Sequence, residues 1–335
     1  MAGTPYVSDR LVTVFGGSGF VGRHVVRALA REGWRVRVAV RRPDLAWFLK
    51  TLGAVGQIEA VQANLRYPDS VRAAVAGASA VVNAVGIKRQ SSRQNYDAVH
   101  VFGAAEIARA AAAEGASMLA QISGIGADPA STNLYIASKG RGEAAAREAF
   151  PGLVVLRPSV VFGPEDEFFN RFAALARLLP VLPLFGGGAT RLQPVFAGDI
   201  GLATAHTLSD AAAAGKIYEL GGPDGMTLRE IVEHTLRVVE RRRLLAPLPF
   251  PLARLLARST EIASAVSLGK FPKALAITRD EIELLRFDNV VSAAAIAGGR
   301  AVRDLGIIPQ SVETVTPSYL YRFRKTGQYA SSRAA

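Results

Sequence analysis

A glycine-rich turn between a short apolar strand and a helix is the feature that most constrains this fold. The apolar run Leu11–Phe15 ends at Gly16, and Gly19 and Gly22 follow at three-residue intervals. The first glycine permits a tight turn, the second lets a pyrophosphate approach the backbone, and the third lets helix and strand pack closely. The following helix would offer free N–H groups to phosphates. The motif predicts a dinucleotide site that uses Gly16, Ser18, Gly19, Phe20, Val21 and Gly22.

The first half of the chain alternates short apolar strands with alanine-rich helices. Further strands are predicted at 35–40, 58–62, 80–84, 118–122 and 153–156, and helices at 21–31, 69–76, 94–114 and 135–149. Such alternation implies parallel strands joined by right-handed crossovers. We therefore expect an α/β fold, a Rossmann-type doubly wound parallel sheet, with a smaller C-terminal α/β lobe.

Glycine and proline become frequent after about residue 163, which marks a change in organisation. We expect a nucleotide-binding domain over 8–163 and a smaller lobe, interleaved with it, over 164–325. Residues 326–335 are predicted to be a disordered tail. Another helix is predicted near 252–268.

Cysteine is absent from the 335 residues, and the four histidines are scattered along the chain. This excludes disulfides, thiolate-ligated clusters and a cysteine nucleophile, and it argues against a metal centre. No run of 18 apolar residues without charges occurs, so no membrane-spanning helix is expected. The N-terminus resembles no secretory signal, so we expect a cytoplasmic protein.

The residues after the second strand indicate which dinucleotide is preferred. Arg41 and Arg42 follow Val40, at the place where an Asp or Glu would accept hydrogen bonds from a ribose 2′-hydroxyl. Guanidinium groups suit a 2′-phosphate by charge and by bidentate geometry. NADP(H) is therefore predicted over NAD(H), which stays possible if both arginines are simply solvated.

Two further motifs and the glycine-rich loop together resemble an extended short-chain dehydrogenase/reductase of atypical kind. They are Tyr135-Ile136-Ala137-Ser138-Lys139 and the segment Leu156–Pro164. The resemblance implies that Asn64 and Leu65 lie near the adenine, and that Ala84, Val85, Gly86 and Pro158 line the cofactor.

In active members of that family, a tyrosine exchanges a proton with the substrate and a lysine four residues later holds the nicotinamide ribose. Tyr135 and Lys139 keep this spacing, which brings both side chains to one helix face. The third group is a Ser or Thr hydroxyl. Here Ser123 is the first residue of the usual pair, and Gly124 stands at the substrate-orienting position. Two alternatives follow: a weak or vestigial reductase that uses Ser123, or a structural cofactor site.

A narrower resemblance covers residues from about 10 to 325. Phe162–Phe172, Gln193–Ile200 and Thr278–Leu285 resemble the alpha-subcomplex subunit 9 family of respiratory complex I, in its alphaproteobacterial form. It implies an NADPH-holding accessory subunit with little or no turnover, bound to peripheral-arm subunits on the cytoplasmic face of the inner membrane. Two other functions stay open: a free-standing NADP-dependent reductase or epimerase, and a nucleotide-responsive regulatory protein.

The net charge of +12 is concentrated toward the C-terminus. Residues 235–273 hold eight basic and two acidic side chains, and 317–335 hold four basic and no acidic ones. Because leucines recur at helical spacing among these charges, the segment 240–273 predicts contact with an anionic membrane surface. A solvated helix face or an acidic protein partner would explain the same charge. No recognisable nucleic-acid-binding motif accompanies it, so nucleic acid is not expected.

Overall fold

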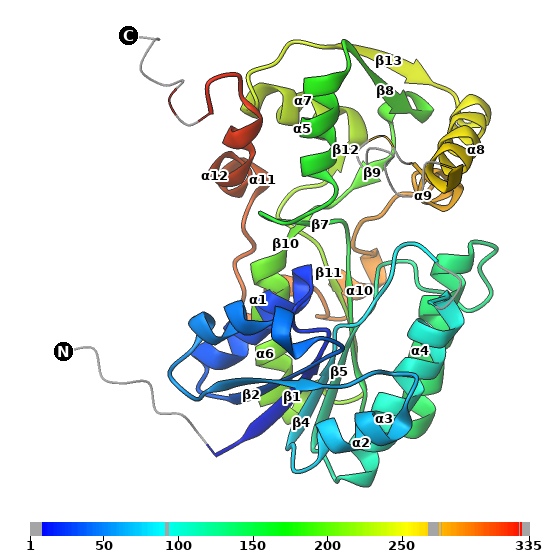
Figure 1. Cartoon of the computed structure of the whole chain (residues 1–335). Coiled ribbons are helices and arrows are strands. Elements are labelled where there is room, and N and C mark those ends of the chain that lie inside the picture. Colours follow the sequence, from blue (N-terminus) through cyan, green and yellow to red (C-terminus); the bar gives the residue numbers. More distant parts are fainter. Residues whose placement is uncertain (1–8, 91–93, 267–274, 276, 328, 330–335) are drawn as a thin grey trace. The chain divides into compact units, whose positions relative to one another are not determined.

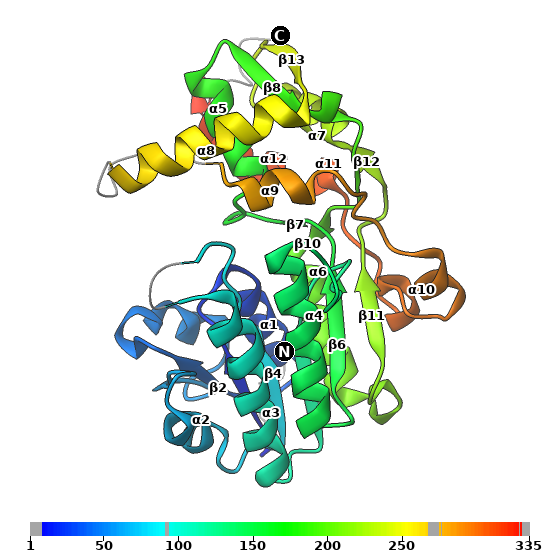
Figure 2. The ribbon, with the colours of Figure 1, turned by 90° about the vertical axis from the view of Figure 1, so that its right-hand side faces the viewer.

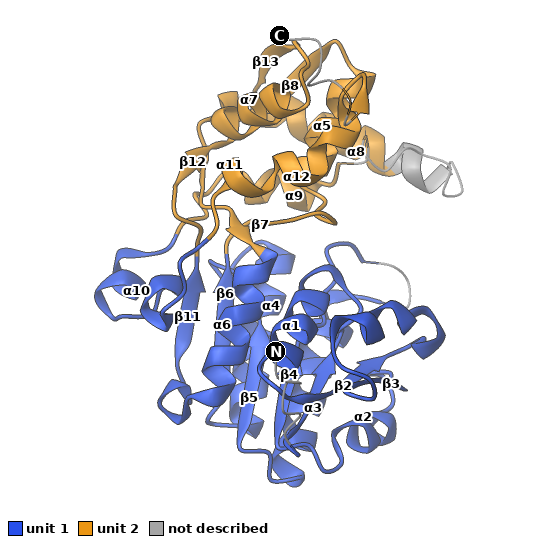
Figure 3. Cartoon of the chain, turned by 90° about the vertical axis from the view of Figure 1, so that its left-hand side faces the viewer, with its two compact units in different colours: residues 1–158, 197–220, 291–309 blue, residues 159–196, 221–290, 310–335 orange. Residues whose placement is uncertain are grey.

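The computed structural model describes residues 9–90, 94–266, 275, 277–327 and 329, and it divides the chain into two compact units (Figure 3). Unit 1 combines Met1–Pro158, Ala197–Leu220 and Val291–Pro309. Unit 2 combines Ser159–Phe196, Gly221–Val290 and Gln310–Ala335. This division differs from the continuous ranges 8–163 and 164–325, because the chain returns to unit 1 twice. Most of the predicted tail 326–335 and part of the segment 240–273 lie outside the described residues.

A seven-stranded parallel sheet forms the centre of unit 1, in the order β11-β6-β5-β4-β1-β2-β3 (Figure 1). Every pairing in it is parallel, which confirms the doubly wound architecture. The edge strand β11 has no counterpart among the predicted strands, because four residues between loops carry too short a pattern. The strands are β1 (Leu11–Phe15), β2 (Arg35–Val40), β3 (Ile58–Gln62), β4 (Ala80–Asn83), β5 (Met118–Ile122), β6 (Val154–Pro158) and β11 (Ile217–Leu220).

Helices cover both faces of this sheet (Figures 1 and 2). One face carries α2 (Pro68–Val75), α3 (Gly103–Ala113) and α4 (Leu134–Ala149), and the other carries α1 (Phe20–Arg31) and α6 (Ala197–Ser209). The contact between α1 and α6 needs a glycine, because a Cβ at Gly201 would lie 2.5 Å from the carbonyl oxygen of His24. The short helix α10 (Ala293–Ala297) completes unit 1.

The helix predicted over 94–114 is two segments. A π-helical stretch, Asp97–Phe102, leads directly into α3. Such bulges are rare and are found mostly at functional sites. His100 lies within this stretch and is buried. The π-helical stretch therefore contributes a buried imidazole to the region of the site described below.

Unit 2 consists of short strands and helices packed around a hydrophobic core that includes Phe162, Phe169 and Phe172. Three two-stranded sheets pair β7 (Val161–Phe162) with β10 (Val195–Phe196), β9 (Arg191–Leu192) with β12 (Met226–Thr227), and β8 (Val181–Phe185) with β13 (Leu244–Leu248). Its helices are α5 (Phe169–Leu178), α7 (Leu228–Val238), α8 (Phe250–Val266), α9 (Arg279–Leu284), α11 (Val312–Val315) and α12 (Pro317–Leu320).

Within unit 2, two hydrogen bonds between buried side chains hold the C-terminal segment that contains α11 and α12 to the rest of the unit. The Tyr319 hydroxyl donates to the Asp166 carboxylate at 2.6 Å, and His234 Nε2 lies 2.7 Å from the hydroxyl of Thr316. Asp166 is buried and also accepts from the Asn170 N–H, so its polar atoms are satisfied. Among the described residues, none of the helices combines the length and apolar character that a bilayer crossing requires.

Candidate functional site

The glycine-rich loop has the geometry that its spacing predicts. Gly16 has a φ of +76°, and the Gly19 N–H donates to the Gly16 carbonyl oxygen at 2.9 Å. A Cβ at Gly22 would lie 2.1 Å from that same oxygen, so only glycine fits there. Gly19 is the N-cap of α1 and caps it with no side chain, which leaves the N–H groups of the first turn free for an anion. Ser18, Phe20 and Val21 are half-buried around this turn.

The segment after β4 runs beside the loop. A Cβ at Gly16 would lie 3.0 Å from the Ala84 carbonyl group and 3.1 Å from the Val85 side chain. The Val85 N–H donates to the Asn83 side chain at 3.1 Å, which fixes the turn out of the strand. Two parts of the predicted cofactor site, far apart in sequence, therefore meet at the carboxyl ends of β1 and β4.

Lys139 is a buried residue whose ammonium group has no hydrogen-bonding partner among the described residues. It stands on α4, four residues after Tyr135, with Nζ 6.0 Å from the centroid of the Tyr135 ring. The residue is 7% exposed, and within the described part of the chain Nζ makes no hydrogen bond or ion pair. Burial lowers the pKa of Lys139 to about 8, although the charge of Glu143 acts in the opposite direction. Burial also raises the pKa of the Tyr135 hydroxyl.

The lysine faces the backbone that leaves β4. A Cβ at Gly86 would lie 3.2 Å from Lys139 Nζ, so Gly86 and Lys139 belong to one wall of the site. The N-cap Asn133 accepts hydrogen bonds from the N–H groups of Tyr135 and Ile136, which fixes where α4 begins. A buried cation that lacks a partner costs free energy, so this arrangement favours a ligand that accepts hydrogen bonds from it.

The Ser123 hydroxyl donates its hydrogen bond to another residue of the protein and does not point a free donor at a substrate. Its hydroxyl donates to the buried carboxylate of Glu143, which also binds Arg157 through two hydrogen bonds of 3.1 and 2.6 Å. The single hydroxyl proton of Ser123 is therefore committed, and it cannot polarise a substrate carbonyl. A Cβ at Gly124 would meet nothing closer than the Pro158 carbonyl oxygen at 3.9 Å, so a hydroxyl is missing there although space exists. Pro158 ends β6, and its carbonyl accepts from the Ile125 N–H at 3.0 Å.

The two arginines after β2 differ in their contacts. Arg42 pairs with Asp44 at 2.8 Å, and this hydrogen bond holds the pKa of Asp44 below its usual value. Arg41 is exposed and makes no hydrogen bond or ion pair with any described residue. Arg41 is therefore the freer of the two guanidinium groups.

Of the two residues expected near the adenine, one has a polar and one an apolar environment. The Asn64 side chain accepts from the Arg66 N–H at 3.2 Å, and Leu65 packs so closely on α3 that a Cβ at Gly103 would lie 2.7 Å from it. Both are half-buried.

Three residues near the site have no counterpart in the sequence-based prediction. The Arg23 guanidinium donates to the carbonyl oxygens of Gly19 and Ser18 at 3.3 and 3.2 Å, and it lies 5.0 Å above the Phe48 ring. The rings of Tyr96 and His100 each make an edge-to-face contact with the ring of Tyr135. Of these three residues, only Arg23 could have been placed near the site from sequence, because it directly follows Gly22. Among the described residues, no group of acidic or histidine side chains could hold a metal ion.

Comparison with known proteins shows the family to which the chain belongs. Residues 16–160 match the NAD(P)H-binding family. The NADH dehydrogenase [ubiquinone] 1 alpha subcomplex subunit 9 of Arabidopsis thaliana mitochondria is 31% identical over 328 residues, which are 97% of this chain and 81% of the relative. The chain belongs to this family of complex I subunits. Its first half is thus an NAD(P)-binding domain of the short-chain dehydrogenase/reductase type.

One further sequence relative and one solved structure are reductases. The ceramide reductase of Caulobacter vibrioides is 31% identical over 291 residues, covering 86% of this chain and 88% of the reductase. The triphenylmethane reductase of Citrobacter sp., solved as a complex with NADP(H), superimposes with a TM-score of 0.65 at 17% identity, covering 92% and 97% of the two chains. The structural likeness supports the fold, and the family membership rests on the sequence.

Proposed function

We propose that this protein is an accessory subunit of respiratory complex I that holds NADPH as a structural cofactor, with little or no turnover. The observation that carries the proposal is Lys139, a buried residue whose ammonium group has no partner among the described residues and lies at the same end of the sheet as the glycine-rich loop. The loop and the first turn of α1 would bind the pyrophosphate, and Lys139 would bind the nicotinamide ribose. The cofactor itself would supply hydride chemistry if a substrate were present.

The lack of turnover follows from the two positions after β5. Ser123 donates its only proton to Glu143, and Gly124 carries no hydroxyl. Tyr135 and Lys139 could exchange a proton, but neither of the two positions after β5 offers a free hydroxyl to orient a carbonyl for hydride transfer.

NADP(H) is proposed over NAD(H) because of Arg41. An exposed guanidinium that has no partner among the described residues suits a 2′-phosphate, whereas Arg42 already pairs with Asp44. We assign the 2′-phosphate contact mainly to Arg41.

The test is native mass spectrometry of the protein isolated from solubilised membranes. We expect one NADPH per chain and co-purification with peripheral-arm subunits of complex I. Bound NADPH at a hundred times its dissociation constant would raise the free energy of unfolding by about 2.7 kcal/mol. Recovery as a free monomer without nucleotide would contradict the proposal.

A second candidate function is an NADP-dependent reductase, and the retained Tyr135–Lys139 pair favours it. Purified protein that oxidises bound NADPH with a carbonyl substrate, and loses this activity in Tyr135→Phe, would establish that function. A regulatory protein is the third possibility, and it would bind nucleotide and a partner outside complex I.

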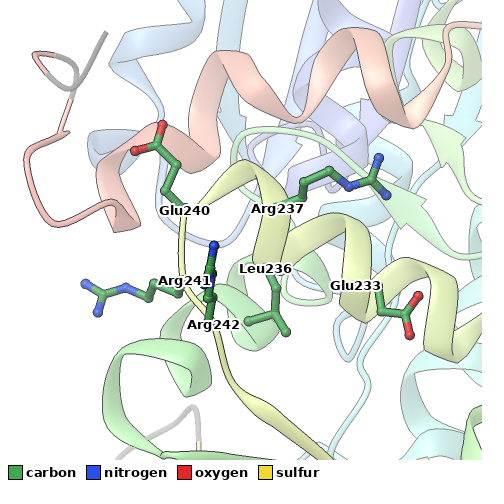
Figure 4. A pocket seen from close by; sticks show the side chains of 6 residues that line it. All are labelled: Glu233, Leu236, Arg237, Glu240, Arg241 and Arg242. Carbon is green, nitrogen blue, oxygen red and sulfur yellow. The ribbon is translucent and has the colours of Figure 1, made fainter. Parts of the chain in front are cut away.

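We further propose that unit 2 contacts an anionic membrane surface, which would place the protein peripherally on the cytoplasmic face of the inner membrane. Arg237, Arg242 and Arg258 make no ion pair with any described residue, whereas Glu233 and Glu240 are paired with Arg229 and Arg324. Figure 4 shows Arg237 and Arg241 extending to opposite sides of a pocket at the end of α7. Such diverging charges suit an extended anionic surface better than one small anion.

The exposed face of α8, which carries Arg258, also presents apolar side chains. Ala253 and Ala257 face the core of unit 2, while Leu252 and Leu255 are 55% and 66% exposed. Leucines beside arginines are typical of helices that lie in the membrane interface.

Vesicle co-sedimentation tests the surface. We expect the full-length protein to bind phosphatidylglycerol vesicles, to ignore phosphatidylcholine vesicles, and to dissociate as the salt concentration rises. Leu252→Ser combined with Leu255→Ser should abolish binding, and the matched control replaces two exposed apolar residues of unit 1, Ile296→Ser with Ile308→Ser. Failure of the wild-type protein to bind anionic vesicles would contradict this part of the proposal and favour docking through protein contacts.

A further inference from the structure

The backbone segment 86–88 is fastened by two side chains that the proposed cofactor contacts do not include. The Ile87 N–H donates to His100 Nε2 at 3.0 Å, and the Tyr96 hydroxyl donates to the Lys88 carbonyl oxygen at 2.9 Å. Between Ala84 and these contacts lies Gly86, which faces Lys139 Nζ. This segment therefore joins the glycine-rich loop, at one end, to the buried lysine at the other.

The hydrogen bonds fix the protonation of His100. The Ser138 hydroxyl donates to the Tyr135 carbonyl oxygen at 2.7 Å, so it can only accept from His100 Nδ1, which lies 2.8 Å away. Nε2 accepts from Ile87, so the ring is neutral and carries its proton on Nδ1. Burial and the charge of Lys139 lower the pKa of His100 to about 3, which keeps this arrangement unchanged near neutral pH.

Ring contacts make His100 part of a rigid group. The Tyr96 ring stacks on His100 with centroids 5.5 Å apart, and each of the two rings lies 5.7 Å from Tyr135 in an edge-to-face contact. Helix α4 also packs directly on this point, since a Cβ at Gly142 would lie 2.0 Å from the His100 carbonyl oxygen. The imidazole is thus held by two ring contacts and by hydrogen bonds at both nitrogens, and α4 packs on the His100 backbone.

We propose that His100 is a positioning residue for the nicotinamide half of the bound dinucleotide. By accepting a hydrogen bond from the Ile87 N–H, His100 keeps the segment 86–88 beside Lys139. The nicotinamide half of the cofactor would then contact a backbone segment of fixed position. We expect the adenosine half to be unaffected, because it is assigned to the glycine-rich loop and Arg41, which form none of the hydrogen bonds of the His100 ring among the described residues. This inference rests on the proposed NADPH site.

Two substitutions separate the roles of the two ring nitrogens. His100→Gln retains an acceptor near the position of Nε2 and can still hold Ile87. His100→Asn retains a donor near the position of Nδ1 and can still reach Ser138, but it is too short to reach Ile87. If His100 only stabilised the fold, the two variants would behave alike.

The measurement compares NADPH with 2′,5′-ADP, which lacks the nicotinamide half. In His100→Asn we expect NADPH to bind about tenfold more weakly and 2′,5′-ADP to bind within twofold of wild type, while His100→Gln stays close to wild type for both. Amide hydrogen exchange at Ile87 should be faster in the Asn variant and unchanged in the Gln variant. Equal losses for both ligands, or no difference between the variants, would overturn the assignment.

A milder variant covers the case in which neither His100 variant folds. Tyr96→Phe removes only the hydroxyl that binds Lys88, and it should weaken NADPH about threefold without affecting 2′,5′-ADP. Unchanged NADPH affinity in this variant would count against the positioning role. Failure of the wild-type protein to bind either ligand would instead refute the proposed cofactor site, so the two proposals fail separately.

Discussion

Units 1 and 2 differ in how they hold their cationic side chains. In unit 1, Lys139 is buried and Arg157 is half-buried, and a single buried carboxylate, Glu143, influences both. In unit 2, Arg237 and Arg242 are exposed and form no ion pair within the part of the chain that the structure describes. The enclosed charges can distinguish one ligand from another because desolvation strengthens each contact. The exposed charges act together over an area and are sensitive to salt.

The largest expected effect is in the glycine-rich loop. Gly22→Ala should lower the free energy of unfolding by about 3 kcal/mol and abolish NADPH binding, because its Cβ would lie 2.1 Å from a backbone oxygen that cannot move aside. Thermal denaturation and fluorescence titration measure both effects. Gly124→Ala is the matched control, since its Cβ has room, and a similar loss in that control would contradict the steric explanation.

Lys139→Met should separate ligand binding from stability. NADPH affinity is expected to fall about 100-fold because the buried ammonium donates charge-assisted hydrogen bonds to the ligand. Without ligand, the variant should be more stable than wild type by about 1 kcal/mol, since an unpartnered buried charge is removed. Chemical denaturation with and without NADPH checks the pair of effects. A ligand-free variant that is markedly less stable would contradict the view that this lysine serves the cofactor.

The depressed pKa of Lys139 predicts opposite pH trends for folding and binding. The folded-state pKa of about 8 lies below the usual 10.5, so between these values the unfolded chain binds more protons. The ligand-free protein should therefore become more stable as pH rises through this window, by up to about 1.4 kcal/mol per pH unit, relative to Lys139→Met. NADPH affinity should fall over the same window. Parallel trends in wild type and variant would disprove the assignment.

A smaller effect is expected at the adenosine end. Arg41→Ser should weaken NADPH about tenfold and leave NADH unchanged, because one charge-assisted contact to the 2′-phosphate is lost. Arg42→Ser should have a weaker effect, since Arg42 is already paired with Asp44. Isothermal titration with both nucleotides gives the comparison, and equal effects on NADH and NADPH would refute the 2′-phosphate contact.

The smallest effect on stability is expected on the outer face of α8. Leu255→Ser should change the free energy of unfolding by less than about 0.5 kcal/mol, because this side chain is 66% exposed. Urea denaturation measures it. A much larger loss would show that Leu255 packs within the protein and is not available to a membrane.

The nucleotide-binding half was largely predictable from sequence, because its signals are local. Glycine spacing, the alternation of strand and helix, and the interval from Tyr135 to Lys139 each act within a few residues. His100 could not be predicted, since its role depends on Ser138 and Ile87, which the fold brings together. The commitment of Ser123 to Glu143 depends likewise on a tertiary contact. β11 escaped prediction because its place at the sheet edge is set by β6, some sixty residues earlier.

The interleaving of the two units has a consequence for the order in which the protein forms during synthesis. Every residue assigned to the nucleotide site lies within the first continuous stretch of unit 1, before Ser159. The strand β11 and the helix α10 that complete this unit emerge only later, after part of unit 2. An early-bound nucleotide could therefore stabilise a sheet whose last strand has yet to be translated, and neither unit can be removed by shortening the chain at one end.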